Sequence, residues 1–498
     1  MEVALGFFGV ILACFTIILT RWIICRRNIH RSLKKYGIPG PKPDFIAGNM
    51  YQLQKEPNPN DIIEDWLKKY GDVFGYFMGE DIYVVIKDLE MLKKVLIKDF
   101  SVFSNKPTFL LQTDPFPKML IGLRDKRWKE VRNVLTPAFS SGKIKFMTDV
   151  VSKKVDLFVD LVMKKANNKE IINIHELGQG LTLDVISACA LAVKKNIQEN
   201  PKDDILQAVR DTFKHQFNPI EELGILFPFL SKILHLFDDL FIFKKSLNTI
   251  ADHLKVVMKE RRQNPNLRSL DILQSILDSC DSVSDGNGTK LTEEEAIANA
   301  LVVLLAGYNT TANSLGFTFF LLATHPEIQD RLYQEIRQAR DTSYSTLQNM
   351  TYLDQVYSES LRVYPPVTGF IHRKCDRDYD LGPYTIPKGA NIIAPVWNIH
   401  HDPNLWPDPN KFDPDRFSPT NKGSIQSMSY FPFGAGPRNC IGSRFAQLEA
   451  KIAIYRILQK VKLEPCEKTD NPLSLVCAAF TILPVNGVWL KATPRNPC

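Results

Sequence analysis

The chain has 498 residues, of which 44% are apolar and 23% charged, a composition typical of globular proteins and unlike that of disordered ones. The formal net charge of +7 is not gathered into a long basic stripe with interleaved aromatic side chains, which argues against a nucleic-acid-binding function. The nine cysteines are odd in number and widely spaced, without a C-x-x-C pair, which argues against a disulfide framework or a zinc ribbon.

Residues 1–27 carry an apolar run from Val3 to Leu19, followed by basic side chains that begin at Arg21. A helix of roughly 20 such residues spans a bilayer. Only Glu2 precedes the run and no A-x-A-like site follows it, which favours an uncleaved signal anchor over a cleaved signal peptide. Because the basic residues follow the run, the positive-inside rule predicts a single-pass anchor with the rest of the chain in the cytoplasm.

Residues 28–44 are basic and proline-rich, and Pro39, Pro41 and Pro43 cannot continue a helix, which predicts a stiff linker. The alternating apolar residues of 72–88 then predict a β-hairpin. From about residue 89 to about residue 339 the helical period dominates, with one polar loop at 278–290.

One helix stands out within that stretch. Thr292 and Glu295 form a capping-box pattern, and a proline-free, apolar segment then runs to about His325, on the order of 50 Å of helix. Because the segment is apolar nearly all round, we expect it at the centre of the molecule. Polar residues 309–311 lie near its middle beside Gly307; taken alone, they favour a packing notch with hydroxyls bonded to backbone carbonyls over an active site.

Beyond residue 380 the chain is proline-rich and irregular, with short strand-like pieces, and a second helix is predicted from Ser443 to about Val461. The tail segments 476–484 and 485–494 are predicted to pair as β-strands. No linker is visible after residue 43, so residues 45–498 are predicted to form one large domain, mainly α with small β-sheets. A domain of this size exceeds the usual single core, and a buried prosthetic group would account for it.

The stretch FPFGAGPRNCIG at 431–442 poses the question of what Cys440 does there. Three roles are open: buried filler, a nucleophile with His400 or His401 as its base, or a metal ligand. As a ligand the cysteine would be alone in sequence, and a lone thiolate suits a metal whose other ligands come from a macrocycle, as in haem. The glycines let backbone approach such a ring, and the helix that follows favours the charged sulfur.

The same stretch matches F-x-x-G-x-R-x-C-x-G, and on this match the chain resembles the cytochrome P-450 family of haem-thiolate monooxygenases. The five fixed residues would match by chance on the order of once in ten thousand chains of this length. The resemblance implies the cytochrome P-450 fold with a single large haem domain, and haem b with Cys440 as the axial ligand of the iron. The matching residues are Phe433, Gly436, Arg438, Cys440 and Gly442.

Further family motifs follow in the family's order. Residues 306–311 resemble its oxygen-activating helix, and Glu359, Arg362 and Arg416 resemble its Glu-Arg-Arg network. The resemblance also implies contacts to the haem propionates, which it places at Trp128, Arg132, Arg373 and Arg438. Taken singly, an E-x-x-R is an ordinary surface pair, a W-x-x-x-R is packing plus a solvated arginine, and a PDRF is a turn.

The resemblance covers the whole chain and is closest to the microsomal family-three type, the drug and steroid oxidisers, to which thromboxane synthase is related. It implies a membrane-anchored protein of the endoplasmic reticulum that uses O2 and a lipophilic small molecule. It also implies electrons from NADPH through a separate reductase, with cytochrome b5 as a further candidate donor. The chain has no G-x-G-x-x-G after a strand and so no evident nucleotide-binding fold of its own.

Two residues of the central helix carry the catalytic predictions. The resemblance assigns proton delivery to Thr310, beside Ala306; the alternative is a threonine bonded back to its own helix. Asn309 stands where the family usually has an acid, and asparagine does not titrate near neutral pH. Either protons arrive by water and more peroxide leaks, or the reaction needs few protons.

The resemblance also predicts a mainly apolar substrate pocket without lysine or arginine, which favours a bulky neutral lipophile. Its walls are placed at Leu120, Ile121, Ala306, Val367, Thr368, Gly369, Phe370, Ala479, Phe480 and Thr481. The apolar stretch 223–237 is expected either to dip into the membrane or to pack in the core.

Three function classes remain at this point. The leading one is an NADPH-driven monooxygenase. The second is a haem-thiolate isomerase that rearranges a lipid peroxide without a reductase, and the third is a non-enzymatic haem sensor or carrier.

Overall fold

The computed structural model describes residues 2–107, 114–191, 196–213, 219–234, 242–269, 271–281, 290–339, 341–478 and 480–495. The chain divides into two compact units. We call residues 1–110, 217–234 and 372–395 the sheet unit, and residues 111–216, 235–371 and 396–498 the helical unit. No boundary between them is visible in the sequence, because each unit is assembled from three segments that are distant in the chain.

The sheet unit is built on the predicted hairpin. Strands β1 (Val73–Met78) and β2 (Asp81–Ile86) are antiparallel, which confirms the hairpin within 72–88. β7 (Asn391–Ile393) lies parallel to β2, and β4 (His372–Lys374) lies antiparallel to β7. The other elements of the unit are α2 (Met50–Leu53), α3 (Pro59–Tyr70), α4 (Leu89–Lys93), a π-helix (Lys94–Lys98), α9 (Pro219–Leu226), a 3-10 helix (Pro228–Leu230), α10 (Ser231–Leu234), β5 (Tyr379–Asp380) and β6 (Thr385–Ile386).

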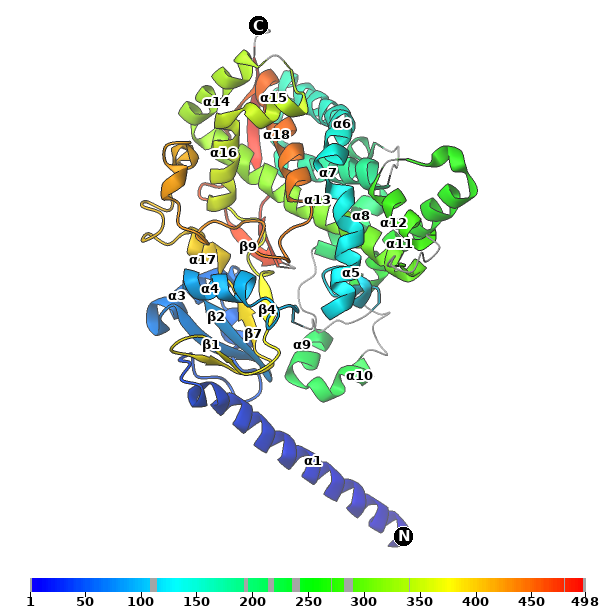
Figure 1. Cartoon of the computed structure of the whole chain (residues 1–498), viewed down its shortest axis with the longest axis vertical. Helices are drawn as coiled ribbons and strands as arrows, with labels where there is room; N and C mark the ends of the chain where they lie inside the picture. Colours follow the sequence, from blue (N-terminus) through cyan, green and yellow to red (C-terminus); the bar gives the residue numbers. More distant parts are fainter. Residues whose placement is uncertain are drawn as a thin grey trace. The chain divides into compact units, whose positions relative to one another are not determined.

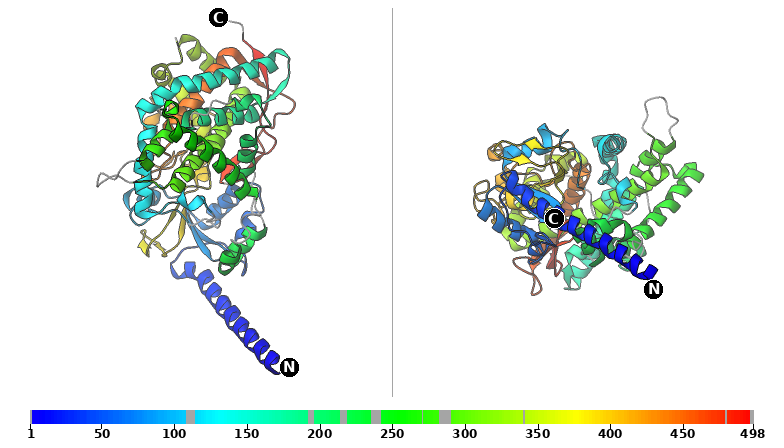
Figure 2. Two further views of the ribbon diagram at one scale, coloured as in Figure 1. Left: turned by 90° about the vertical axis from the view of Figure 1, so that its right-hand side faces the viewer. Right: turned by 90° about the horizontal axis from the view of Figure 1, so that it is seen from below.

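Helix α1 (Glu2–Lys35) projects from the sheet unit (Figures 1 and 2). Among the described residues it is the helix long and apolar enough to cross a membrane. It continues to Lys35, so the first part of the predicted linker 28–44 is helical. The remainder is not a free spacer, because Ile38 is buried and the carbonyl of Pro39 accepts a hydrogen bond from the Gly75 amide at 2.8 Å.

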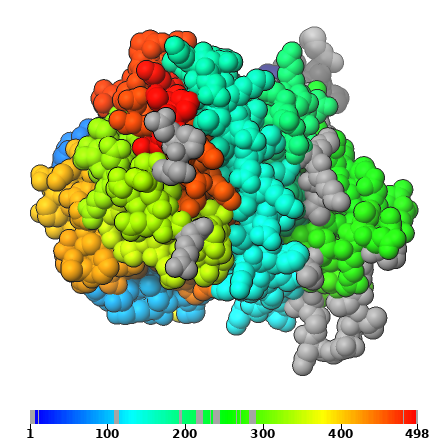
Figure 3. Space-filling model, turned by 90° about the horizontal axis from the view of Figure 1, so that it is seen from above, coloured from blue at the N-terminus to red at the C-terminus, as the bar shows by residue number. Residues whose placement is uncertain are grey.

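The helical unit holds most of the chain's helices, as predicted for a mainly α protein (Figure 1). They are α5 (Asp125–Leu135), α6 (Ser141–Asn167), α7 (Ile174–Leu191), α8 (Asp204–Phe213), α11 (Ile242–Gln263), α12 (Ile272–Asp281), α13 (Glu293–Thr324), α14 (Pro326–Gln338), α15 (Tyr344–Asn349), α16 (Thr351–Val363), α17 (Val396–His400) and α18 (Ser443–Lys460). Figure 3 shows one outer face of this unit, where α6, in cyan, lies between yellow-green residues of α14–α16 and green residues of α11 and α12.

The long central helix is confirmed as α13. Its start is fixed by the predicted capping box: the Thr292 hydroxyl accepts from the Glu295 amide, and the Glu295 carboxylate accepts from the Thr292 amide. The helix is buried along almost its whole length, because apolar side chains cover every face of it. It packs chiefly against α7, and also against α11 and α18.

The strands of the helical unit correct one prediction. Segments 476–484 and 485–494 do not pair with each other: β9 (Leu475–Ala478) and β10 (Thr481–Pro484) form a hairpin that spans the first segment and the residue before it. β11 (Trp489–Pro494) pairs instead with β8 (Val461–Pro465) and β3 (Ile171–Asn173). A local pattern identifies strands but not distant partners, and β3 also interrupts the stretch that was predicted to be helical.

Candidate functional site

The loop 431–442 turns sharply on two glycines before α18 begins. Gly434 and Gly436 have φ angles of 73° and 72°, a conformation that residues with a Cβ adopt only under strain. The Cys440 amide donates to the Phe433 carbonyl at 2.8 Å, which closes the turn. The Cys440 side chain is exposed. The loop therefore presents a single sulfur from a compact backbone.

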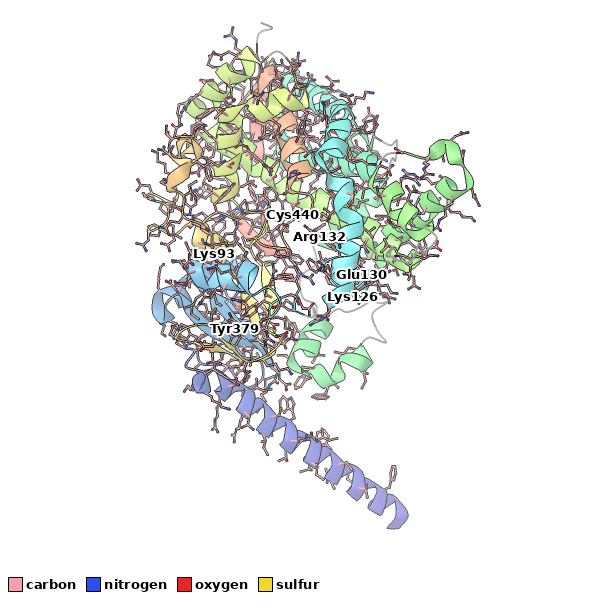
Figure 4. The ribbon with its side chains drawn as sticks, viewed as in Figure 1. Lys93, Lys126, Glu130, Arg132, Tyr379 and Cys440 are labelled. Carbon is pink, nitrogen blue, oxygen red and sulfur yellow. The ribbon has the colours of Figure 1, made fainter. Side chains whose placement is uncertain are left out.

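Cationic and aromatic side chains gather around this loop. Arg132 of α5 donates from Nη2 to the Asn439 side-chain oxygen at 3.2 Å, and Figure 4 labels it together with Cys440. Burial lowers the pKa of Arg132, and the neighbouring Cys440 opposes that shift. The Arg438 guanidinium lies 4.1 Å from the ring centroid of Trp128 and donates a hydrogen bond to a backbone carbonyl of the loop that precedes α5. The structure thus brings together three of the four residues expected at haem propionates.

The middle of α13 opens on one face. Its neighbours along the helix are buried, but Ala306 is exposed and Gly307 and Thr310 are half-buried. Ala306 and Thr310 are four residues apart and so lie on the same face. The Thr310 hydroxyl donates to the Ala306 carbonyl at 2.7 Å, the back-bonded geometry considered as an alternative above. A hydroxyl bonded in this way keeps its lone pairs free to accept a further hydrogen bond.

Gly307 has a separate, structural reason to be glycine. A Cβ at this position would lie 2.8 Å from Cδ1 of Ile186 on α7. The notch expected around residue 307 is therefore present, and it seats a neighbouring helix.

Asn309 points to a different neighbour than Thr310 does. The Asn309 side chain is 1% exposed, and its Nδ2 donates to the Thr481 hydroxyl at 2.9 Å. That hydroxyl in turn donates to the Ala478 carbonyl at 3.0 Å. The amide is therefore engaged with the β9–β10 hairpin.

The predicted pocket walls meet in part. Val367 forms an isolated bridge with Thr481, and the rings of Phe370 and Phe480 lie 5.7 Å apart between centroids. Thr368 and Gly369 both donate to the Phe480 carbonyl, at 3.4 and 3.5 Å.

The loop that holds Leu120 and Ile121 is attached near the N-terminal end of α13: the Leu120 amide donates to the Asn299 side-chain oxygen at 2.9 Å. Ala479 lies outside the described residues.

The Glu-Arg-Arg residues form a buried network and not a surface pair. Arg362 donates from Nε and Nη2 to the two carboxylate oxygens of Glu359 at 2.7 and 2.8 Å, and both side chains are 0% exposed. Arg416 approaches the same carboxylate at 3.3 Å. The Arg362 Nη1 also donates to the His400 carbonyl, which ties α16 to α17.

Two further candidate residues are buried and have backbone partners. Arg373 belongs to the sheet unit: it is buried on β4, its Nη1 donates to the His372 carbonyl, and burial lowers its pKa to about 10. His400, a possible base for a nucleophilic cysteine, accepts from the Phe431 amide through Nε2 at 3.2 Å, and burial lowers its pKa well below the usual range. That nitrogen is therefore used to hold the start of the loop.

Sequence reasoning missed two asparagines that work alongside the predicted residues. Asn299 holds the Leu120 loop, as described above. Asn313 donates from Nδ2 to the Ile482 carbonyl at 3.0 Å and accepts from His175 Nε2 at 2.8 Å. The available signal was their polarity on a helix that is otherwise apolar, since buried amides need partners.

The donor set fits haem. Among the residues that the structure describes, no three His, Cys, Asp or Glu side chains gather into a metal site, so within them Cys440 belongs to no such cluster. Arg132 and Arg438, the arginines beside the loop, suit the propionate carboxylates of a haem. The open face at Ala306 and Thr310 provides a surface in a helix that is otherwise buried.

Comparison with known proteins gives a consistent result. A family model described as Cytochrome P450 matches residues 38–490. Cytochrome P450 3A16 of Mus musculus is 34% identical over 494 residues, which cover 98% of this chain and 96% of the relative. Cytochrome P450 3A29 of Sus scrofa is 34% identical over 476 residues, which cover 94% and 93%. Cytochrome P450 3A2 of Rattus norvegicus is 34% identical over 494 residues, which cover 98% and 96%.

Proposed function

Because the chain belongs to the cytochrome P450 family of haem monooxygenases, whose cofactor is a cysteine-ligated haem b, we propose that it inserts one atom of O2 into bulky neutral lipophiles. Xenobiotics, steroids and other lipids are the substrate class. The second oxygen atom leaves as water, and the reaction consumes two electrons and two protons. The electrons come from NADPH through a separate reductase, with cytochrome b5 as a further donor. The observation that carries the proposal is the exposed Cys440 on a glycine-shaped loop among cationic side chains.

Cys440 is the residue proposed to bind the haem iron. Haem, when bound there, supplies an iron that activates O2 reductively, and donation from the thiolate favours cleavage of the O–O bond. The chain favours the anionic sulfur because α18, an 18-residue helix, begins three residues later and directs its positive end toward the loop. Phe433 accepts the hydrogen bond of the Cys440 amide, Gly442 follows the cysteine, and Gly436 gives the backbone its turn. Backbone amides directed at the sulfur are proposed to keep it anionic.

The arginines hold the cofactor's carboxylates. Arg132 and Arg438 lie beside the loop, and the Arg438 guanidinium lies 4.1 Å from the ring centroid of Trp128, a cation–π contact that helps to hold it there. Guanidinium groups bind carboxylates through two parallel hydrogen bonds, so they orient the macrocycle as well as neutralise it. Arg373 is a further candidate on the strength of the resemblance.

Thr310 is proposed to hold a proton at its Oγ1 on the open face of α13. Rotation of the hydroxyl away from the Ala306 carbonyl would release a donor to that face, and the lone pairs accept from an ordered water. Asn309 cannot take part as an acid, and its amide is engaged elsewhere. Water is therefore the proton carrier in this proposal.

The protein is proposed to be anchored in the endoplasmic reticulum membrane by α1 in a single pass, with residues 45–498 as the catalytic body on the cytoplasmic side. A second apolar surface on the sheet unit supports membrane contact. Phe229 and Ile233 are 59% and 56% exposed, whereas Ile225 and Leu226 are buried against Ala47 and Met50. The stretch from 223 thus divides into a packed side and an outward apolar side; residues 235–237 lie outside the described residues.

A reduced-plus-carbon-monoxide difference spectrum tests the thiolate. We expect the thiolate-ligated band for the wild type and its loss in Cys440→His, while Cys466→Ser, a cysteine outside the loop, keeps it. A band at the histidine-ligated position in the wild type would refute the proposal. NADPH consumption with reductase and a panel of neutral lipophiles then tests the reaction. Product formed from a lipid peroxide without NADPH would indicate an isomerase, and haem binding without any turnover would indicate a sensor or carrier.

A further inference from the structure

We propose that Asn309 is a positioning residue whose hydrogen bond to Thr481 ties the β9–β10 hairpin to α13 and thereby holds Phe480 in the substrate wall. We call this hydrogen bond the latch. The inference deepens the proposed function and rests on it for the meaning of the wall. It concerns a side chain that points away from the open face of α13, and so it assigns Asn309 a role other than proton transfer.

The direction of the hydrogen bonds selects an amide at this position. Thr481 is 4% exposed, and its hydroxyl hydrogen is used on the Ala478 carbonyl. The same oxygen can then only accept from Asn309, whose Nδ2 lies 2.9 Å away. An aspartate carboxylate has no hydrogen to donate, so it could bond to Thr481 only by taking the hydroxyl hydrogen away from the Ala478 carbonyl. Because the site is buried, water does not replace the missing donor without a cost.

A second amide one turn later fixes the register of the hairpin. Asn313 donates to the Ile482 carbonyl, and its own oxygen is held by His175 of α7. Burial lowers the pKa of His175, so the neutral ring donates from Nε2. Asn309 and Asn313 lie four residues apart on α13 and hold two consecutive residues of β10, which opposes both sliding and tilting of the strand.

The hairpin carries this constraint to the predicted wall. The Ile482 amide donates to the Pro366 carbonyl at 3.0 Å. Phe480, between the two strands, has a φ of 71°, a conformation that costs a bulky residue energy and persists only when its surroundings impose it. Its ring packs on Phe370, and a Cβ on Gly369 would lie 3.5 Å from the ring. Loosening the latch is therefore expected to move Phe480 relative to residues 367–370.

Amide hydrogen exchange on the haem-loaded protein measures the latch directly. We expect Asn309→Ala and Asn309→Asp to exchange about fivefold faster in residues 475–484, the change that corresponds to one neutral hydrogen bond. Thr481→Val is expected to have the same effect from the other side of the bond, and Thr481→Ser to restore protection. The matched control is Asn299→Ala, a buried asparagine of the same helix, which is expected to affect the Leu120 loop and not the hairpin.

Substrate readouts connect the latch to specificity. For a lipophile that the wild type oxidises at more than one position, we expect the latch variants to change the product distribution and to weaken binding about fivefold, with Thr481→Ser near the wild type. Protection of the hairpin equal to that of the wild type in Asn309→Ala and Thr481→Val would overturn the proposal. So would a change confined to peroxide release, since this would place Asn309 in proton supply. The carbon monoxide spectrum of the same samples separates either outcome from a failure of the haem assignment.

Discussion

Replacing Glu359 by glutamine tests how much the buried ion pair with Arg362 contributes to stability. Glutamine keeps the shape of the side chain but removes its charge, while Arg362 stays 0% exposed. Two charge-assisted hydrogen bonds, at 2.7 and 2.8 Å, lose their ionic acceptor, and Arg416 loses a carboxylate 3.3 Å away. Removing one partner of a buried pair costs about 3–5 kcal/mol. This is a large part of the roughly 5–15 kcal/mol that stabilises a typical protein.

The control is an exposed pair with the same spacing. Lys255 lies 2.7 Å from Asp252, three residues earlier on α11, and their side chains are 57% and 68% exposed. Asp252→Asn is expected to cost about 0–1 kcal/mol, because water screens the pair. Urea unfolding of the haem-loaded proteins, followed by far-ultraviolet circular dichroism, gives the comparison. If Glu359→Gln unfolds at the same urea concentration as Asp252→Asn, the argument from burial is refuted.

Three further predictions concern single sites. Thr310→Val is expected to slow product formation about 100-fold and to divert electrons to peroxide, whereas Thr310→Ser should stay near the wild type. The measurement follows NADPH, product and peroxide in the same reaction. Equal behaviour of the two variants would contradict this prediction. Gly307→Ala is expected to destabilise the protein by about 1–3 kcal/mol through contact with Ile186, and Ile186→Val to recover part of this loss, as measured by urea midpoints. Burial lowers the pKa of His401 to about 4, so the unfolded state takes up this proton first and the stability of the protein falls as the pH drops from about 6.5 to about 4. His401→Gln should make that fall less steep. An equally steep curve of stability against pH would exclude His401 as a source of the fall.

The candidate site could be predicted to the extent that it is continuous in sequence. The loop 431–442 carries the cysteine, the glycines that turn it and the start of α18 in a single stretch, so composition and spacing describe it. Thr310 and Asn309 were both singled out, but their directions were not. Adjacent helical residues point about 100° apart, and which neighbour each one meets depends on how the helix is packed.

Other parts of the candidate site depend on distant contacts. The resemblance places Arg373 with Arg132 and Arg438 at the haem propionates, and this stays a prediction for a residue on a strand of the sheet unit. The glutamate–arginine pair at 359 and 362 is indistinguishable from a surface pair by its spacing alone, and only its burial gives it weight. The asparagines at 299 and 313 have no sequence signature beyond being polar on an apolar helix.

The amino-acid sequence by itself determined the hairpin at 72–88, the capped central helix, the helix after Cys440, the apolar N-terminal segment and the cysteine loop. Each of these depends on residues within a few positions of one another, through periodicity, capping and turn chemistry. The tertiary structure decided the partners of β11, the division into two units, and the attachment of Asn309 to Thr481. These depend on contacts between residues that belong to separate segments of the chain, and the free energy of such contacts comes from burial and from matched donors and acceptors, which no local pattern encodes.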